Sequence, residues 1–258
     1  MLNAVSRIHK KDTVKDMQGY IDIHSHILPG VDDGAENLEM SLKMLQIAQT
    51  EGIRRIILTP HNKPMRHNVG PESMGRRMEE LQEALDQSGM EIRLYAGSEI
   101  YYRSDIVELL DNGKVCSMAG SDYVLIEFNP MDDYDYIRGG IYQLMAGGYK
   151  PILAHAERYK CVSASVQKAE ELVSMGCYIQ LNAGSVMGNF GYVTRHFCKQ
   201  VLKKQLVHFV ATDAHRADGK RAPYIEECAR YIKKHFGEEY MRLLLQVHPA
   251  KVIADECI

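Results

Sequence analysis

The chain of 258 residues has no apolar run approaching the roughly 20 residues of a membrane-spanning helix, which excludes membrane insertion. Its first 18 residues are polar, mixed in charge and without the apolar core of a signal peptide, so we expect residues 1–18 to form a flexible leader. A formal net charge of −3 does not favour a broad nucleic-acid surface. No linker, repeat or low-complexity run divides the rest, and we expect one domain over residues 19–258.

Paired cysteines are also lacking. The six cysteines are dispersed and none forms a C-x-x-C pair, which is typical of reduced thiols in a cytoplasmic protein. No arginine stands six residues after any of them, so the phosphate loop of the thiol phosphatases is missing. Hydrolysis of a phosphate ester through a cysteine nucleophile is therefore excluded.

What the chain does have is a regular alternation of short apolar runs and longer segments with helical spacing. Seven strands are expected, at Tyr20–His24, Arg55–Pro60, Ile92–Gly97, Tyr123–Phe128, Pro151–His155, Tyr178–Asn182 and Val207–Thr212. Helices are expected at Asn37–Glu51, Glu72–Gln87, Tyr136–Ala146, Ser165–Met175, Gly191–Lys204, Pro223–His235 and Glu238–Gln246. Left-handed caps are expected at Gly52, Gly89, Gly148 and Gly176.

Strands that alternate with helices indicate parallel β-α units and an α/β fold. Seven such units in about 240 residues favour a closed or nearly closed β/α barrel. An open doubly wound sheet is the main alternative.

Side chains that bind metals stand at the C-terminal ends of nearly all the expected strands. Those ends converge on one face of a β/α barrel. A lone histidine or carboxylate at such a position is more often an ordinary loop or core residue, but the joint pattern predicts a metal cluster. The candidate ligands are His24, His26, Asp33, His61, Glu99, Glu127, His155, Asp213 and His215.

Two of these positions carry further information. His24 and His26 are two residues apart on a strand, so both imidazoles point to the same side and can hold one ion. Glu127 lies inside the buried-looking run VLIEF, where a carboxylate is costly unless it is paired or bound to a metal. Asn182, at the end of the sixth strand, is a weaker candidate.

The number of candidates suggests more than one ion, because a single ion takes about four to six ligands. Two or three divalent ions that share carboxylates, about 4 Å apart, suit displacement at phosphorus. Mixed histidine and carboxylate ligands fit manganese, iron or zinc. Arg158 and Arg221 stand close to ligands in the sequence and could bind phosphate oxygens through their forked guanidinium groups, although a solvated surface charge is an equal alternative.

Six ordered motifs between Tyr20 and Ile253 resemble one known family: IDIHSHILPGVDDGA, ILTPH, GSEIYY, LIEF, AHAERY and ATDAH. The family is that of the bacterial PHP-type (polymerase and histidinol phosphatase superfamily) protein-tyrosine phosphatases of capsule and exopolysaccharide operons, CpsB/CapC-like. One departure is Asn62, where relatives often have a second histidine.

The resemblance implies a distorted (β/α)7 barrel, PHP-like, with three metal ions, for which manganese is expected. It places His24, His26, Glu99 and Asp213 on one ion, Glu99 with Glu127 and His155 on a second, and Asp33, His61 and His215 on a third. Arg158 and Arg221 match the family's phosphate-binding arginines. The implied substrate is phosphotyrosine on a membrane-associated tyrosine autokinase, and the implied role is control of polysaccharide synthesis and export.

These features together predict a metal-dependent phosphoric monoester hydrolase in which water attacks phosphorus without a phosphoenzyme. Three alternatives stay open. One is a small-molecule phosphatase on the same fold, such as a histidinol-phosphate phosphatase. Another is a metal-dependent amidohydrolase, against which the two arginines argue. The last is a non-catalytic binding or regulatory protein that retains a metal site.

Overall fold

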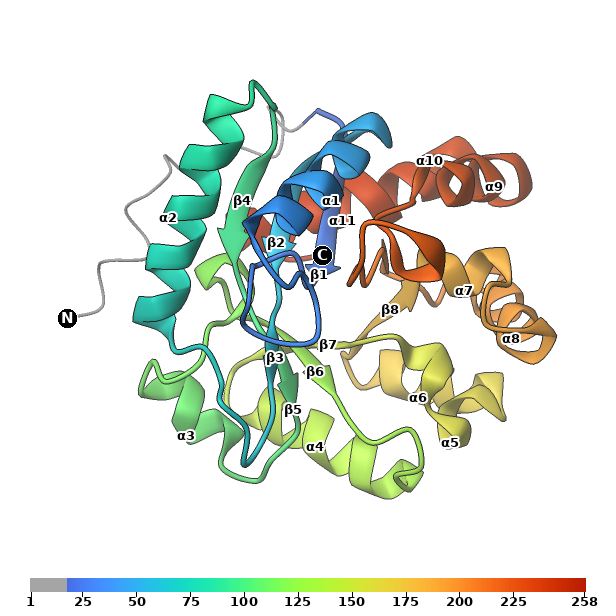
Figure 1. Cartoon of the computed structure of the whole chain (residues 1–258). Helices are drawn as coiled ribbons and strands as arrows, with labels where there is room; N and C mark the ends of the chain where they lie inside the picture. Colours follow the sequence, from blue (N-terminus) through green and yellow to red (C-terminus); the bar gives the residue numbers. More distant parts are fainter. Residues whose placement is uncertain (1–17) are drawn as a thin grey trace.

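Nine short strands form a curled parallel sheet in the computed structural model, which describes residues 18–258 (Figure 1). The expected leader lies, except for Gln18, outside the described residues. The strands are β1 Tyr20–Ser25, β2 Ile53–Leu58, β3 His61–Asn62, β4 Arg93–Ala96, β5 Glu99–Tyr101, β6 Tyr123–Glu127, β7 Lys150–Leu153, β8 Tyr178–Asn182 and β9 Phe209–Ala211.

The strands pair in an order that closes on itself. One sheet runs β1-β2-β4 and the other runs β3-β5-β6-β7-β8-β9, with every pair parallel. The chain runs directly from β2 into β3 and from β4 into β5, so the two sheets form one continuous wall of the barrel. The remaining gap is bridged where Ser25 pairs with Ala214 and the amide of Asp213 donates to the carbonyl of His24 over 2.9 Å. The expected distorted barrel of seven strands is therefore confirmed.

The second and third strands are each interrupted, which the sequence did not indicate. The expected strand Arg55–Pro60 ends at Leu58 and resumes as β3, and the expected strand Ile92–Gly97 resumes as β5. Pro60 has no amide hydrogen to donate to a sheet, which favours a break at this position. Gly97 lies in the second break, and a Cβ there would lie 2.8 Å from Ile57 Cγ2.

Helices follow the strands and surround the barrel (Figure 1). The helices are α1 Leu38–Thr50, α2 Pro71–Gln87, α3 Ile106–Asp111, α4 Tyr134–Ala146, α5 Lys160–Ser163, α6 Val166–Ser174, α7 Ala183–Met187, α8 Tyr192–Lys203, α9 Glu226–Phe236, α10 Glu238–Arg242 and α11 His248–Ala254. The four glycines expected as caps all have positive φ. The expected helix Glu238–Gln246 instead begins as α10 and passes through a π turn, Leu243–Val247, into α11, with Pro249, which has no amide hydrogen, next to the junction.

An apolar layer lies beneath the ends of the strands. Ile23, Leu125 and Ala211 are fully buried and belong to one cluster with Val252 and Ile253 of α11. Each of these strand residues precedes a candidate ligand by one or two positions. The polar cluster therefore stands on a packed floor that limits how far its side chains can move.

Candidate metal centre

All nine candidate ligands lie together at the C-terminal ends of the strands. Their ligand atoms form four overlapping groups in which every atom is within 4.8 Å of the others, and among the residues from 18 onward no other side chain joins such a group. The groups are His24 with His26 and Asp213, His24 with Glu99 and His155, His61 with Glu99 and Glu127, and His26 with Asp33, His61 and His215.

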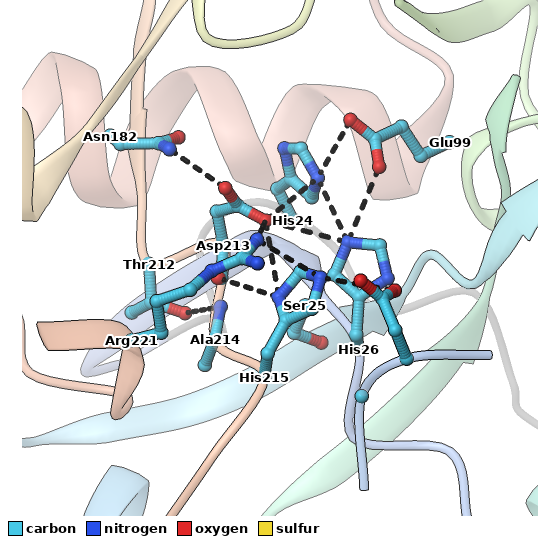
Figure 2. A network of polar contacts seen from close by, with 12 residues as sticks. His24, Ser25, His26, Glu99, Asn182, Thr212, Asp213, Ala214, His215 and Arg221 are labelled. Carbon is cyan, nitrogen blue, oxygen red and sulfur yellow. Dashed lines mark hydrogen bonds and ion pairs between the residues drawn. The ribbon is translucent and has the colours of Figure 1, made fainter. Parts of the chain in front are cut away.

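The most deeply buried part joins two histidines and two carboxylates (Figure 2). The Nε2 atoms of His24 and His26 are 3.3 Å apart. Each is 3.3 Å from an oxygen of Glu99, and they are 3.5 and 3.4 Å from Asp213 Oδ1. Ligands about 2.1 Å from a tetrahedral ion lie about 3.4 Å from one another, so His24, His26 and Asp213 are spaced to share one ion, and a different oxygen of Glu99 lies beside each imidazole.

Glu99 stands between this group and two others. Its Oε1 is 2.7 Å from His155 Nε2, and its Oε2 is 2.7 Å from His61 Nδ1. The Nδ1 atom of His61 is also 3.1 Å from Glu127 Oε1. The two oxygens of Glu99 face different histidines, which is the arrangement of a bridging carboxylate.

The outermost group includes Asp33, whose side chain is 63% exposed. Asp33 Oδ1 is 3.3 Å from His61 Nε2 and 3.5 Å from His215 Nε2. The rings of His26 and His215 are 3.8 Å apart between centroids. Because the other ligands are buried or nearly so, this group marks the side on which the cluster opens to solvent.

The structure groups Glu127 with His61 and Glu99, and it groups His155 with His24 and Glu99. That Glu99, Glu127 and His155 share one ion stays a prediction. Lys63, which the sequence analysis did not single out, is 3.3 Å from Glu127 Oε1. This ion pair helps to hold Glu127 on the His61 side of the cluster.

Irregular backbone aims several of the ligands into the barrel. In β1 two residues, Ile23 and His24, oppose the single residue Ile57 of β2, so the strand is bulged beside His24. His155 and Asp213 have positive φ, at 35° and 51°. Non-glycine residues adopt this conformation at a cost of about 1–3 kcal/mol, and such strain collects at functional sites. Here it turns the chain at the end of a strand while the side chain stays inside the barrel.

Buried polar residues behind the ligands fix the imidazole orientations. Asp32 accepts from His26 Nδ1 at 2.8 Å and from the backbone of Gly34 at 2.9 Å. Gln180 Oε1 lies 3.1 Å from His24 Nδ1 and accepts from the backbone amide of His155 at 2.7 Å. These contacts leave the Nε2 atom of each ring pointing into the cluster, as histidine ligands require.

Gln180 was missed by the sequence analysis, because a glutamine within an apolar strand gives no signal of its own. Its Nε2 donates to Asn182 Oδ1 at 2.9 Å, and Asn182 Nδ2 donates to Asp213 Oδ2 at 2.8 Å. Asn182, the weaker candidate of the sixth strand, therefore supports a ligand. Gln180 and Asn182 link His24, His155 and Asp213 into one hydrogen-bonded unit.

Replacing Gln180 with alanine is expected to weaken metal binding about 10–100-fold, the usual cost of losing a partner behind a metal ligand. The measurement is the metal dissociation constant, from competition with a chelator of known affinity. Gln180→Glu keeps an acceptor for His24 and should lose less affinity. Equal affinity in wild type and Gln180→Ala would show that Gln180 does not position the ligands.

The carboxylates of the cluster raise the pKa values of two of its histidines. Burial opposes charge on His61, but the neighbouring carboxylates of Asp33, Glu127 and Glu99 raise the pKa of this imidazole to about 12. Burial likewise opposes charge on His26, yet Asp213, Asp32 and Glu99 raise its pKa to about 10. Such carboxylates call for compensating cations, and protons must leave these rings before a metal can bind. Metal affinity should therefore fall as the pH falls.

Three buried side-chain atoms are better placed to bind a metal ion than to hydrogen-bond to one another. His61 Nδ1, Glu99 Oε2 and Glu127 Oε1 are buried and close together, but none of them has a hydrogen-bond partner with acceptable geometry. Buried polar atoms are almost always paired in folded proteins. Their shared orientation and their chemistry fit divalent cations.

The two candidate arginines both reach the cluster. Arg158 Nη2 donates to Asp213 Oδ2 at 2.6 Å, and Arg221 Nη2 donates to Asp213 Oδ1 at 3.1 Å (Figure 2 shows Arg221). Their side chains are 30% and 35% exposed. Each guanidinium group therefore donates one hydrogen bond to the carboxylate of Asp213. Each is also partly exposed at the open end of the site, where it can bind an anion.

Residues 20–254 match the family model described as "Capsular polysaccharide synthesis, CpsB/CapC". The chain belongs to the CpsB/CapC family. It is 32% identical over 243 residues to tyrosine-protein phosphatase CpsB of Streptococcus pneumoniae, covering 92% of this chain and 100% of that protein. It is also 32% identical over 227 residues to tyrosine-protein phosphatase YwqE of Bacillus subtilis (strain 168), covering 88% of this chain and 89% of that protein.

A solved structure from this family agrees with the fold. It comes from a study of YwqE from Bacillus subtilis and CpsB from Streptococcus pneumoniae, described there as unique metal-dependent tyrosine phosphatases. The match has a TM-score of 0.86 at 31% identity and covers 92% of this chain and 96% of that one. In the part of the chain that the structure describes, no helix of this CpsB/CapC member is long and apolar enough to cross a membrane.

Proposed function

We propose that this protein is a metal-dependent protein-tyrosine phosphatase that hydrolyses phosphotyrosine to tyrosine and inorganic phosphate. The observation that carries the proposal is the convergence of nine ligand side chains and two arginine guanidinium groups at one mouth of the barrel. Divalent ions held there would supply Lewis-acid stabilisation of phosphoryl charge and would acidify water. The names of the relatives support phosphotyrosine as the substrate class.

The roles of the residues follow from their positions. His24, His26, Glu99 and Asp213 would hold the most buried ion, and Glu99 would bridge to the ions held by the remaining ligands. Arg158 and Arg221 would orient the phosphoryl oxygens, because each keeps part of its guanidinium group exposed at the mouth. Asp32, Gln180 and Asn182 position ligands and do not reach the mouth.

We propose manganese as the native ion, with iron or zinc as alternatives, bound as two or three ions per chain. The proposed partner is a tyrosine autokinase of capsular or exopolysaccharide synthesis, which fits the description of the family. A cytoplasmic location fits six free cysteines, none of which is in a disulfide.

A substrate panel tests the proposal against its alternatives. Purified full-length protein with added manganese is expected to hydrolyse a phosphotyrosine peptide faster than histidinol phosphate, and to leave a cyclic amide intact. Excess chelator should abolish the activity, and manganese should restore it. Preference for histidinol phosphate would indicate the small-molecule phosphatase, and hydrolysis of the amide would indicate an amidohydrolase. Full activity in chelator would contradict metal dependence.

A further inference from the structure

Exposed apolar side chains collect on the face where the metal centre opens. In the described part of the chain nine large apolar side chains are exposed. Five lie between the end of a strand and the first turn of the helix that follows it, Leu38, Met65, Met131, Tyr136 and Tyr224, and three lie between α7 and the first turn of α8, Phe190, Tyr192 and Val193. The ninth, Tyr142, lies further along α4. Exposed apolar groups around a polar site are typical of a surface that binds another molecule.

Phe190 is the member of this set with a direct link to the site. It lies in the turn between α7 and α8, two helices that pack together beside the barrel (Figure 1). Its ring is 42% exposed and lies 5.8 Å from Arg158 Cζ, measured to the ring centroid. Arg158 in turn contacts the ligand Asp213. The guanidinium group of Arg158 therefore lies between the exposed ring of Phe190 and the candidate metal centre.

The position of the Phe190 ring is defined by its support. A Cβ built on Gly184 of α7 would lie 3.2 Å from Phe190 Cε2, so the ring rests close against the start of that helix. The Asn189 amide donates to the Gly184 carbonyl at 2.9 Å and fixes the turn. α7 begins directly after Asn182, which holds Asp213. The Phe190 ring is therefore held in a defined position at the edge of the site.

We infer that Phe190 is a specificity-determining residue that packs against the phenyl ring of phosphotyrosine, and that Tyr192 and Val193 contact the residues flanking it in a protein substrate. This inference rests on the proposed phosphatase function and deepens it. A phosphate held by Arg158 would leave its ester group within reach of Phe190. Aromatic pairs contribute about 0.5–1.5 kcal/mol beyond buried area, which corresponds to about 2–12-fold in affinity.

Two neighbours of Phe190 extend the surface in one direction. Tyr192 is 80% exposed and Val193 is 76% exposed, and both lie in the first turn of α8. A small phosphate ester would end at Phe190, whereas a peptide would continue over these residues. The arrangement favours an aryl phosphate carried on a peptide over a free small metabolite.

The test compares two peptides that differ only in the phosphorylated residue, one with phosphotyrosine and one with phosphoserine. For the manganese-loaded full chain, Phe190→Ala is expected to raise KM for the phosphotyrosine peptide about 5–10-fold and to leave kcat and the KM for the phosphoserine peptide nearly unchanged. Phe190→Tyr should restore most of the loss. Tyr142→Ala, which removes the exposed aromatic ring that lies off this face, should change neither constant.

Binding gives a second readout that does not depend on turnover. Calorimetry with a non-hydrolysable phosphonomethyl-phenylalanine peptide should show about 5–10-fold weaker binding to Phe190→Ala. Equal losses with both peptides, or unchanged binding of the phosphonate, would overturn the role of Phe190 while the phosphatase function stood. A wild-type protein that hydrolysed neither peptide would instead contradict the proposed function.

Discussion

Asp213→Ala is expected to remove most of the phosphatase activity, by more than about 100-fold, and to lower the metal content of the purified protein. Asp213 contacts His24 and His26, and it also accepts from both arginines and from Asn182. Losing only a partner of a metal ligand usually costs about 10–100-fold, so losing a ligand that also anchors two guanidinium groups should cost more.

The measurements are elemental analysis for bound metal and steady-state kinetics on a phosphotyrosine peptide. Asp218→Ala is the matched control, because Asp218 is an exposed aspartate five residues further along the same loop. It should keep normal metal content and activity. If Asp213→Ala bound as much metal as wild type, Asp213 would not be a ligand, and the grouping with His24 and His26 would need another explanation.

Arg158→Ala should lower kcat/KM for a phosphotyrosine peptide about 100–1,000-fold with metal content close to normal. This is the usual effect of removing one donor that stabilises charge in a transition state. Arg158→Lys should recover only part of the loss, because a single ammonium group cannot hold two phosphate oxygens in the way that a guanidinium fork does.

The distinction between substrate binding and metal binding decides how this result is interpreted. Arg158 donates to the ligand Asp213, so metal content must be measured in the same preparations. Arg138→Ala on α4, an exposed arginine paired with Asp135, serves as the control and should behave like wild type. Unchanged turnover of Arg158→Ala would remove this residue from the site.

The sequence predicted well those features that depend on residue type and local spacing. His24-x-His26 and Asp213-x-His215 stood out because acids and imidazoles followed apolar runs, and parallel strands bring such ends to one face. The same logic located Glu127, whose buried carboxylate lies among the candidate metal ligands. The glycine caps could be predicted because glycine adopts positive φ without the steric cost that other residues have.

Other features depend on contacts between distant segments and could not be predicted from the sequence. Gln180 and Asp32 look ordinary along the chain, and their importance comes from imidazoles 156 and 6 residues away in sequence. The breaks between β2 and β3 and between β4 and β5 depend on how neighbouring strands pair. The contact between Glu127 and His61 depends on which way each side chain turns inside the barrel.

The sequence by itself determined the parts of this protein: apolar runs of strand length, helices with glycine ends, and nine candidate ligand side chains in a fixed order along the chain. The tertiary structure alone decided their geometry. Barrel closure brings His24 beside Asp213, a bulge sits beside His24, and positive φ turns the chain at His155 and Asp213. The physical reason is that strained backbone and buried charge persist only where surrounding packing and hydrogen bonds hold them, and those partners come from elsewhere in the chain.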